Sequence, residues 1–485
     1  MHMHSARFSR CLVALLVLGG CATNPVTGSR EFVLMTEAQE IAMGREVDGE
    51  VRRQMGLYED DALQGYVEEI GLALASRSHR PNLPWSFAIV DSAAINAFAV
   101  PGGFIYLTRG IMPFLSDEAD LVGVLGHEIG HVTARHTVRA YTRQSGAQLG
   151  LLVGSIFSPT ARAVGGLAER GLGVLFLRHG RDAELQADRL GAEYAAISGW
   201  DPVGVRDMLS TLSRISEGSE GRGVPNWLST HPAASDRVER VGSTLFELAA
   251  RMDIVGLLVN RQGYLDRLDG LVYGDDPAHG VVRGRDFLHT EFRFALRFPD
   301  GWEVVNTETQ VGATQPGAEA YMELQQVTDP ATQEIGALAV DTMRRSGYRL
   351  DAGGETSING LEAFVGTFTG ARNDDRQPRA RIASIDHGRS LYVMGGMAES
   401  QAYDRVVAEF NEAIRSFRPL SAAEVEEIRP NRIRFYAVRS GDTWQSIARD
   451  AGHDIVVSNT LAIMNGYPVN EQPRSGDRIK IVVEG

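Results

Sequence analysis

The spacing of apolar and polar positions divides the chain into a mostly helical first half and a second half rich in strands. Apolar residues recur at helical spacing from 36 to 55, where Thr36 is a candidate N-cap and Gln39 follows three residues later. Short apolar runs predict three strands, the last two joined as a hairpin, at 84–90, 94–100 and 104–108. Further helices are predicted over 63–76, 184–197, 202–215 and 238–252.

A longer helix is predicted from Asp117 onward, because apolar residues recur at steps of three and four as far as Val132. The apolar stretch from 147 to 157 is only about half as long as a bilayer span, so we expect a buried or membrane-surface helix there. The glycine- and charge-rich segment from 217 to 224 predicts a mobile loop. A domain boundary is expected between about 270 and 285, where turn residues gather.

The pattern changes in the second half of the chain. Short alternating runs such as 292–298 and 363–368 predict a small α+β domain. A charged linker at 421–431 separates it from a last unit. We therefore expect a multidomain α+β protein, with a mostly helical domain containing a small hairpin over 36–275, a small α+β domain over 285–420 and a C-terminal βααβ module over 432–485.

Composition agrees with this organisation and excludes one class of partner. A chain of 485 residues has room for roughly three domains, and 43% apolar with 23% charged residues is typical of globular proteins. The formal net charge is −14 and no long run of basic side chains occurs. Nucleic acid is therefore not expected as a partner.

The N-terminus predicts export and a lipid anchor. Arg7 and Arg10 precede an apolar run that ends in Leu18-Gly19-Gly20-Cys21, so residues 1–20 have the features of a signal peptide. The small residues before Cys21 resemble the bacterial lipobox. This resemblance implies cleavage before Cys21, lipid modification of its thiol and a short polar tether over 21–35. Ala22 stands where an acidic residue would imply the inner membrane, so the periplasmic face of the outer membrane is expected.

The predicted helix after Asp117 carries His127-Glu128-Ile129-Gly130-His131. The spacing of four residues puts both imidazoles on one face of the helix, where they can share one Zn²⁺. A catalytic zinc needs a third protein ligand and an open position for water, and Glu184 is the best candidate for that ligand. Asp188, one turn after Glu184, is placed to accept a hydrogen bond from a ligand histidine.

A longer zinc motif with a third histidine is excluded. Ala134 and Thr137 stand where that motif requires glycine and histidine. His136 lies five residues past His131, which is expected to turn it away from the metal-facing side of the helix.

Together these motifs resemble the gluzincin family of CAAX-prenyl endopeptidase and HtpX type, and most of all its soluble periplasmic lipoprotein members. The resemblance rests on the His127–His131 motif, on Glu184-Leu185-Gln186-Ala187-Asp188, and on flanking segments. Those segments are Asn96-Ala97-Phe98-Ala99-Val100-Pro101-Gly102-Gly103, Ser229-Thr230-His231-Pro232 and Asn24-Pro25-Val26-Thr27-Gly28. The resemblance implies a zincin-like metallopeptidase domain with one Zn²⁺ per chain.

The resemblance also implies a role for individual residues. His127, His131 and Glu184 would hold the zinc, and Glu128 would be the general base. Asn96 would bind an extended peptide at an edge strand. Two alternatives remain open for His231, which either stabilises the oxyanion or occupies the fourth zinc position. Arg237 would support the oxyanion or hold His231 in position.

The C-terminal segment resembles a LysM module. The similar residues are Tyr436-Ala437-Val438-Arg439-Ser440-Gly441-Asp442-Thr443-Trp444, Asn465-Gly466 and Ser475-Gly476-Asp477. This resemblance implies binding of N-acetylglucosamine-containing glycans such as peptidoglycan, while a role in protein contact alone stays an alternative.

The sequence thus predicts a zinc-dependent endopeptidase of the bacterial cell envelope. Its expected substrates are misfolded or misassembled periplasmic and outer-membrane proteins, as in protein quality control. One alternative is a chaperone or assembly factor with the protease fold and secondary cleavage activity. The other is a peptidoglycan-directed amide hydrolase.

Overall fold

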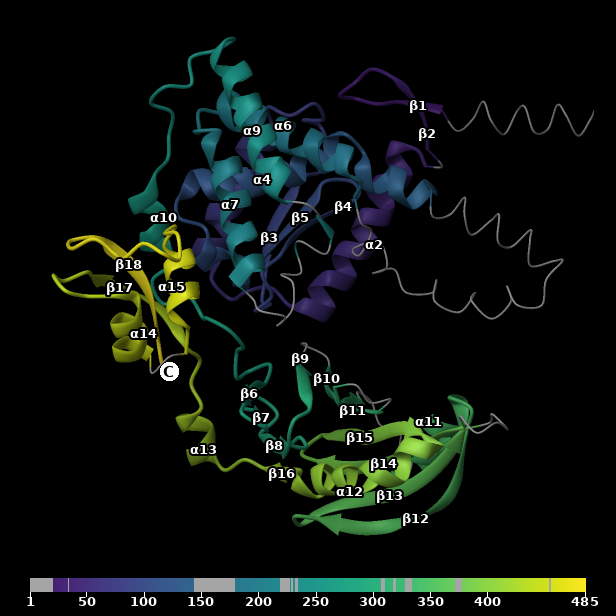
Figure 1. Ribbon diagram of the computed structural model, residues 1–485. Coiled ribbons are helices and arrows are strands. Elements are labelled where there is room, and N and C mark those ends of the chain that lie inside the picture. The colour runs from purple at the N-terminus through teal and green to yellow at the C-terminus, as the bar shows by residue number, and fades with distance from the viewer. Residues whose placement is uncertain are drawn as a thin grey trace, which may run out of the picture. The chain divides into compact units, whose positions relative to one another are not determined.

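The computed structural model of the protein divides into two compact units. It describes residues 21–33, 35–143, 179–218, 227, 230–231, 234–306, 310–316, 320–327, 334–370, 377–452 and 455–485. The first unit combines the chain up to Tyr273 with Arg432–Glu484, and the second is Gly274–Asn431 (Figure 1). The expected signal peptide at 1–20, the expected helix at 147–157 and most of the expected loop at 217–224 lie outside the described residues.

Helices make up most of the first unit, as the apolar spacing predicts. The capping box at Thr36 is confirmed, because the backbone N–H of Gln39 donates to Thr36 Oγ1 and that of Thr36 donates to Gln39 Oε1. The helices of residues 37–267 are α2 (Glu37–Met55), α3 (Asp61–Ala75), the 3₁₀ helix η1 (Arg109–Phe114), α4 (Glu118–Thr133), α6 (Arg181–Ile197), α7 (Val203–Gly218), α9 (Ala234–Ala249) and α10 (Arg261–Arg267).

A small sheet packs among these helices. Its strand order is β3 (Ser86–Val90), β5 (Phe104–Thr108) and β4 (Ala97–Val100), with β3 parallel and β4 antiparallel to β5. The predicted hairpin is therefore confirmed, and β4 is an edge strand. The side chains of β5 are buried throughout, which explains its unbroken apolar sequence.

Helix α4 forms the centre of the first unit, and all of its residues are buried. Glycines on α4 allow its neighbours to approach closely. A Cβ at Gly126 would lie 3.0 Å from the Cα of Gly191 on α6, and one at Gly123 would lie 2.8 Å from the backbone N of Val205 on α7. Small residues therefore bring the backbones of α6 and α7 against α4.

The first described residues form a hairpin, whereas the sequence analysis expected a polar tether over 21–35. Strand β1 (Cys21–Thr23) pairs with β2 (Arg30–Phe32) in antiparallel register. The turn between them is closed by Asn24, whose side-chain Oδ1 accepts hydrogen bonds from the backbone N–H groups of Val26 and Thr27. Local hydrogen bonding by Asn thus gives a polar segment a defined fold.

The C-terminal segment has the expected βααβ order and belongs to the first unit. Its elements are β17 (Arg432–Ala437), α14 (Trp444–Gly452), α15 (Ser458–Met464) and β18 (Arg478–Val483) (yellow in Figure 1). Trp444, Leu461 and Ile479 share one apolar core with residues of α3, α4 and α7. The sequence suggested a separate third unit, but these shared contacts join the module to the helical domain.

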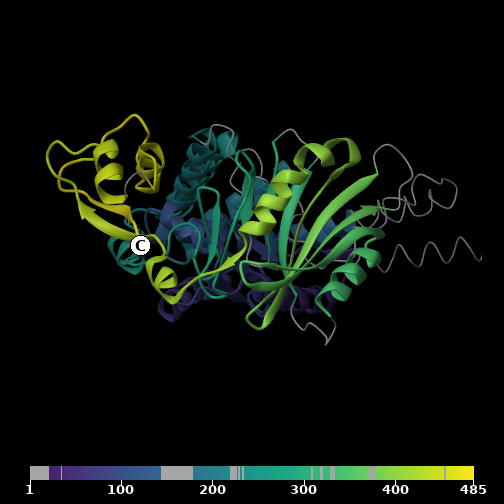
Figure 2. The same ribbon diagram turned by 90° about the horizontal axis from the view of Figure 1, so that it is seen from below.

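The second unit is an α+β structure built on a seven-stranded antiparallel sheet. Along β14 (Pro378–His387), Ile382 packs with helix α11 (Ile335–Arg345), and Ala383 packs on the opposite face with α12 (Ser400–Ser416). Figure 2 shows a helix on each face of this sheet. The strand order is β12 (Tyr348–Ile358), β13 (Leu361–Gly370), β14 (Pro378–His387), β15 (Ser390–Glu399), β11 (Ala320–Val327), β10 (Gln310–Thr314) and β9 (Glu303–Asn306). The helices are α11 (Ile335–Arg345), α12 (Ser400–Ser416) and α13 (Ala422–Glu427).

A second sheet completes this unit, with the order β16 (Arg418–Pro419), β8 (Phe294–Arg297), β7 (Asp286–His289) and β6 (Val281–Arg283). Among the described residues of the whole chain, no helix combines the length and apolar character that crossing a membrane requires.

Candidate metal centre

Helix α4 presents two imidazole nitrogens toward the same point. The Nε2 atoms of His127 and His131 lie 3.0 Å apart, and both side chains are fully buried. The four-residue spacing places the rings one turn apart on the same face of the helix. The structure thus brings together the two nitrogens that the sequence motif predicts.

Glu184 joins them from the first turn of α6. Its Oε2 lies 3.6 Å from His127 Nε2 and its Oε1 lies 3.5 Å from His131 Nε2. The close approach of α6 to α4 makes this possible, since a Cβ at Gly130 of α4 would lie 3.0 Å from the Cα of Ala187. The carboxylate is completely buried, which a charged group tolerates only with partners.

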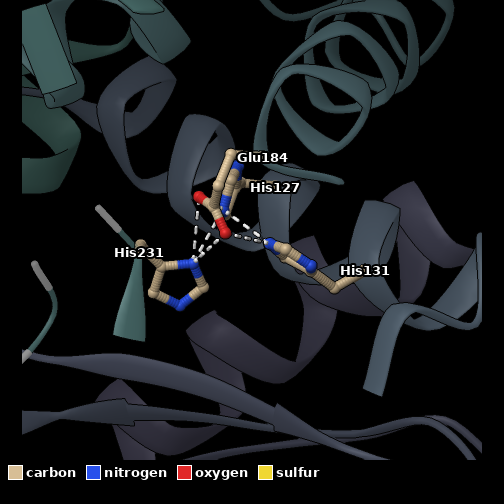
Figure 3. A group of neighbouring side chains, drawn as sticks. All are labelled: His127, His131, Glu184 and His231. Carbon is tan, nitrogen blue, oxygen red and sulfur yellow. Dashed lines mark hydrogen bonds and ion pairs between the residues drawn. The ribbon is translucent and has the colours of Figure 1, made fainter. Parts of the chain in front are cut away.

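His231 supplies a fourth donor (Figure 3). Its Nδ1 lies 3.1 Å from Glu184 Oε1 and 3.3 Å from His127 Nε2. One donor atom from each of His127, His131, Glu184 and His231 falls within 4.8 Å of every other.

The donor set fits a zinc ion. Four ligands at zinc distances of 2.0–2.1 Å in tetrahedral geometry lie roughly 3.3 Å from one another. The distances given above between pairs of these donors, from 3.0 to 3.6 Å, are close to that value, and all four donor atoms lie within 4.8 Å of one another. Two or three histidines with one carboxylate are also a donor set that zinc prefers.

Charges in the cluster compensate one another. Burial by itself would raise the pKa of Glu184, but His231 and Arg237 lower this pKa below its ordinary value. Burial would lower the pKa of His231, but Glu184 and Glu128 raise it. Burial lowers the pKa of His131 well below its usual range, and the neighbouring histidines lower it further. His131 is therefore neutral, which is the form that binds a metal.

Glu128 lies beside the donors and does not belong to the four-residue group. Its side chain is buried, and its Oε1 accepts no hydrogen bond from the described residues. His231 Nε2 lies 3.6 Å from this oxygen. A buried carboxylate oxygen without a hydrogen-bond donor is suited to receive a proton from a water molecule held at the centre.

Asp188 and Arg237 contact the donor residues His127 and Glu184. Asp188 Oδ1 lies 2.9 Å from His127 Nδ1, the ring nitrogen that faces away from the cluster. Arg237 donates to both oxygens of Asp188, at 2.8 and 2.7 Å, and its Nη1 lies 2.8 Å from Glu184 Oε2. Arg237 thus connects the Glu184 carboxylate to the carboxylate of Asp188, which in turn lies beside His127.

Asn96 lies one residue before the edge strand β4. Its side-chain Oδ1 accepts a hydrogen bond from its neighbour Ala97, and its backbone N–H donates to Thr108 Oγ1. The preceding carbonyl, of Ile95, accepts a hydrogen bond from the backbone N–H of Trp227 at 3.3 Å. The segment that carries His231 therefore begins at this end of β4.

The sequence analysis missed two residues at the centre, His179 and Trp227, and did not foresee that His136 contacts His131. His136 Nδ1 lies 2.9 Å from His131 Nδ1, His179 stacks on His131 at a centroid distance of 4.1 Å, and Trp227 stacks on His231 at 4.7 Å. His136 is outside the donor group as expected, but it contacts the ligand because the helix ends and Arg135 adopts a left-handed φ of 58°. No local pattern indicated His179 or Trp227.

Comparison with known proteins supports a metalloprotease. Residues 61–245 match the sequence profile of Peptidase family M48. This span contains the two histidines of α4, Glu184 and His231. The class of protein that the fold and the site support is therefore a metallopeptidase of this type.

Particular relatives agree with this class. The chain is 30% identical over 224 residues to the beta-barrel assembly-enhancing protease of Yersinia pestis, covering 44% of this chain and 45% of the relative. It is 29% identical over 245 residues to the protease of the same name from Escherichia coli K12, covering 47% and 50%. The mitochondrial metalloendopeptidase OMA1 of Arabidopsis thaliana is 28% identical over 204 residues, covering 41% and 40%. The chain spans about half the length of these relatives.

Proposed function

We propose that the protein is a zinc-dependent endopeptidase, with His127, His131 and Glu184 as zinc ligands. The convergence of these donors with a buried carboxylate at Glu128 carries the proposal. When bound, zinc lowers the pKa of its water toward about 7 and polarises the scissile carbonyl. Glu128 takes the proton of that water at its free oxygen and returns it to the leaving amine.

Substrate binds in this proposal as an extended segment beside β4. Among the described residues no strand pairs with the outer edge of β4, where a peptide can add its backbone as a further strand. Asn96 would then contact the peptide through its side chain, and extended binding would favour unfolded polypeptides as substrates.

The proposed resting state has His231 in the fourth donor position. A catalytic zinc must keep one position open for water, and the nearness of His231 Nδ1 to Glu184 and His127 supports a closed arrangement. His231→Ala should therefore raise the cleavage rate several-fold, measured with unfolded casein. The double variant with Glu128→Gln is the control and should abolish the gain. A lower rate in His231→Ala would favour the oxyanion role of His231 instead.

The proposed setting is the periplasmic face of the bacterial outer membrane, with an anchor on Cys21. The names of the relatives from Yersinia pestis and Escherichia coli, which refer to beta-barrel assembly, support misassembled envelope proteins as substrates. The βααβ order of the C-terminal module supports peptidoglycan as a second partner. Retention of the protein on purified sacculi would test that partner.

Casein cleavage by the soluble chain from residue 22 onward tests the enzyme. Glu128→Gln should reduce zinc-dependent cleavage at least a hundredfold while one zinc per chain stays bound, because it removes the base and leaves the ligands. Glu69→Gln, an exposed position on α3, is the matched control and should behave as the parent chain. Cleavage that survives Glu128→Gln would contradict the mechanism.

The same preparations separate the alternatives. Release of cross-linked peptides from sacculi without casein cleavage would favour a peptidoglycan-directed amide hydrolase. If zinc binds but neither the parent chain nor His231→Ala cleaves either substrate, the proposed endopeptidase is refuted and a chaperone or assembly factor is favoured.

A further inference from the structure

The hairpin at the start of the described chain is held closed by its backbone. Cys21 pairs with Phe32 in the β1–β2 ladder. In the turn, the N–H of Asn24 donates to the carbonyl of Ser29 at 2.8 Å, and the N–H of Gly28 donates back to the carbonyl of Asn24 at 2.9 Å. Gly28 has a φ of +69°, which glycine adopts without strain.

Asn24 attaches this hairpin to the active-site helix. Its side-chain Nδ2 donates to the carbonyl of Ala134 at 3.2 Å, and only 1% of Asn24 is exposed. Ala134 is the C-cap of α4, three residues after His131, and its position at a helix end gives it a carbonyl that needs an external donor. A sequence-distant amide therefore caps the helix that carries the metal donors.

A second set of contacts holds the other strand of the hairpin. Glu31 pairs with Arg139 at 2.8 Å, just beyond α4, and also accepts from Asn24 Nδ2 at 3.0 Å. Val33 and Met35 pack with Val138 in a small apolar cluster. Both ends of the hairpin are thus attached to the segment that follows the metal-binding motif.

These contacts limit how far the domain can lie from an anchor at Cys21. A free tether over 21–35 would extend to roughly 50 Å, because an extended chain spans at most about 3.4 Å per residue. Only Ala22 and Thr23 lie between Cys21 and the buried Asn24, and these three Cα-to-Cα steps limit the distance to about 10 Å. Attachment at Cys21 therefore holds the C-terminal end of α4 close to the attachment point.

We propose that the hairpin of residues 21–32 is a rigid mount that docks the metallopeptidase domain on the bilayer surface, with the C-terminal end of α4 toward the lipid. The inference rests on the proposed lipid anchor at Cys21. The partner is the lipid surface, and the substrates favoured are unfolded segments that lie close to it. A flexible tether would instead let the enzyme sample a deep layer of the periplasm.

Energy transfer to the membrane tests the mount without requiring cleavage. The lipidated protein is bound to phosphatidylethanolamine–phosphatidylglycerol liposomes that carry acceptor-labelled lipid. A donor dye is placed on Arg143→Cys, an exposed position near the attached segment, and the lipidated thiol of Cys21 does not compete for the dye. A second chain carries ten Gly and Ser residues inserted between Ala22 and Thr23. The insertion leaves Asn24 and its contacts unchanged but lengthens the connection between Cys21 and the domain by up to about 35 Å.

Energy transfer from the dye to the labelled lipid should be efficient for the chain without the insertion. Its efficiency should be at least twofold lower for the chain with the insertion. Asn24→Ala should also reduce transfer, while Thr27→Ala, an exposed turn residue, is the matched control and should not. Equal transfer with and without the insertion would overturn the rigid mount. Protein that fails to float with the liposomes would refute the anchor and the mount together, whereas casein cleavage reports on the protease independently.

Discussion

At the scale of single residues, the candidate centre contains a network of buried charges that pair with one another. Arg237 is fully buried and contacts Asp188 and Glu184, while Asp188 contacts His127. Removing one member of such a network leaves another charge buried without a partner, which is costly. The orientation of His127 is therefore linked to residues on α6 and α9 that do not touch the proposed metal position.

Asp188→Asn is predicted to weaken zinc binding by about 10–100-fold, because loss of a carboxylate behind a ligand histidine has this typical effect. The neutral amide keeps the shape of the side chain but no longer orients His127 through a charged contact. Competition with a chelator measures the affinity, and Asp182→Asn, exposed on the same helix, is the control. Unchanged affinity in Asp188→Asn would show that His127 is held by other contacts.

At the scale of elements, glycine determines how closely the helices around α4 cross. The backbone of α7 approaches that of α4 most closely at Gly204, where an added Cβ would lie 2.0 Å from the carbonyl oxygen of Ala119. Backbone atoms on both sides leave little freedom to adjust. The same close packing between α4 and α6 brings Glu184 within reach of the histidines.

Gly204→Ala should lower the free energy of unfolding by about 1–3 kcal/mol, as overpacking of a dense core usually does. Gly65→Ala is the matched control: Gly65 is exposed within α3, and an added Cβ there meets no atom within 4 Å. This control should stabilise the protein by up to about 1 kcal/mol through helix propensity. Thermal and denaturant unfolding measure both effects, and a neutral Gly204→Ala would mean that α7 shifts without cost.

At the scale of the whole molecule, the C-terminal module shares an apolar core with the helical domain and also contacts it through a buried lysine. Lys480 on β18, the single lysine of the sequence, is fully buried, and its Nζ donates to the carbonyl of Leu115 at 2.6 Å. Burial, together with Arg261, lowers the pKa of Lys480, Asp120 and Asp117 act in the opposite direction, and the net result is a pKa of about 7. Leu115 lies just before α4, so the module contacts the amino end of that helix.

Because the pKa of Lys480 is lowered on folding, we predict that the free energy of unfolding of the first unit depends on pH. Between about pH 7 and 10.5 the unfolded chain keeps the proton of Lys480 while the folded chain has released it, so this group makes stability rise with pH in that window. From pH 7 to pH 9, the free energy of unfolding of the parent chain should rise by about 2 kcal/mol relative to Lys480→Met.

Denaturant unfolding at the two pH values provides the measurement for both chains. Lys480→Arg serves as the comparison, because arginine stays charged over the whole pH range. The free energy of unfolding of Lys480→Arg should therefore not rise between pH 7 and pH 9 relative to that of Lys480→Met. Parallel pH profiles for the parent and Lys480→Met would contradict the assignment to Lys480.

The sequence by itself determined the features that depend on near neighbours along the chain. The capping box of Thr36 and Gln39 and the pairing of His127 with His131 need only helical periodicity, which is legible in the order of residues. The hairpin of β4 and β5 follows equally from alternation around a turn.

Only the tertiary structure decided which distant segments meet. No repeating pattern in the sequence indicates these contacts. They include the stacking of His179 on His131 and of Trp227 on His231, the capping of α4 by Asn24, and the hydrogen bond from Lys480 to Leu115. Arg135 also redirects His136 toward His131 through a left-handed backbone that helical spacing does not foresee. Local patterns encode the elements because neighbouring residues interact through fixed backbone geometry, whereas contacts across the fold depend on how all the elements pack at once.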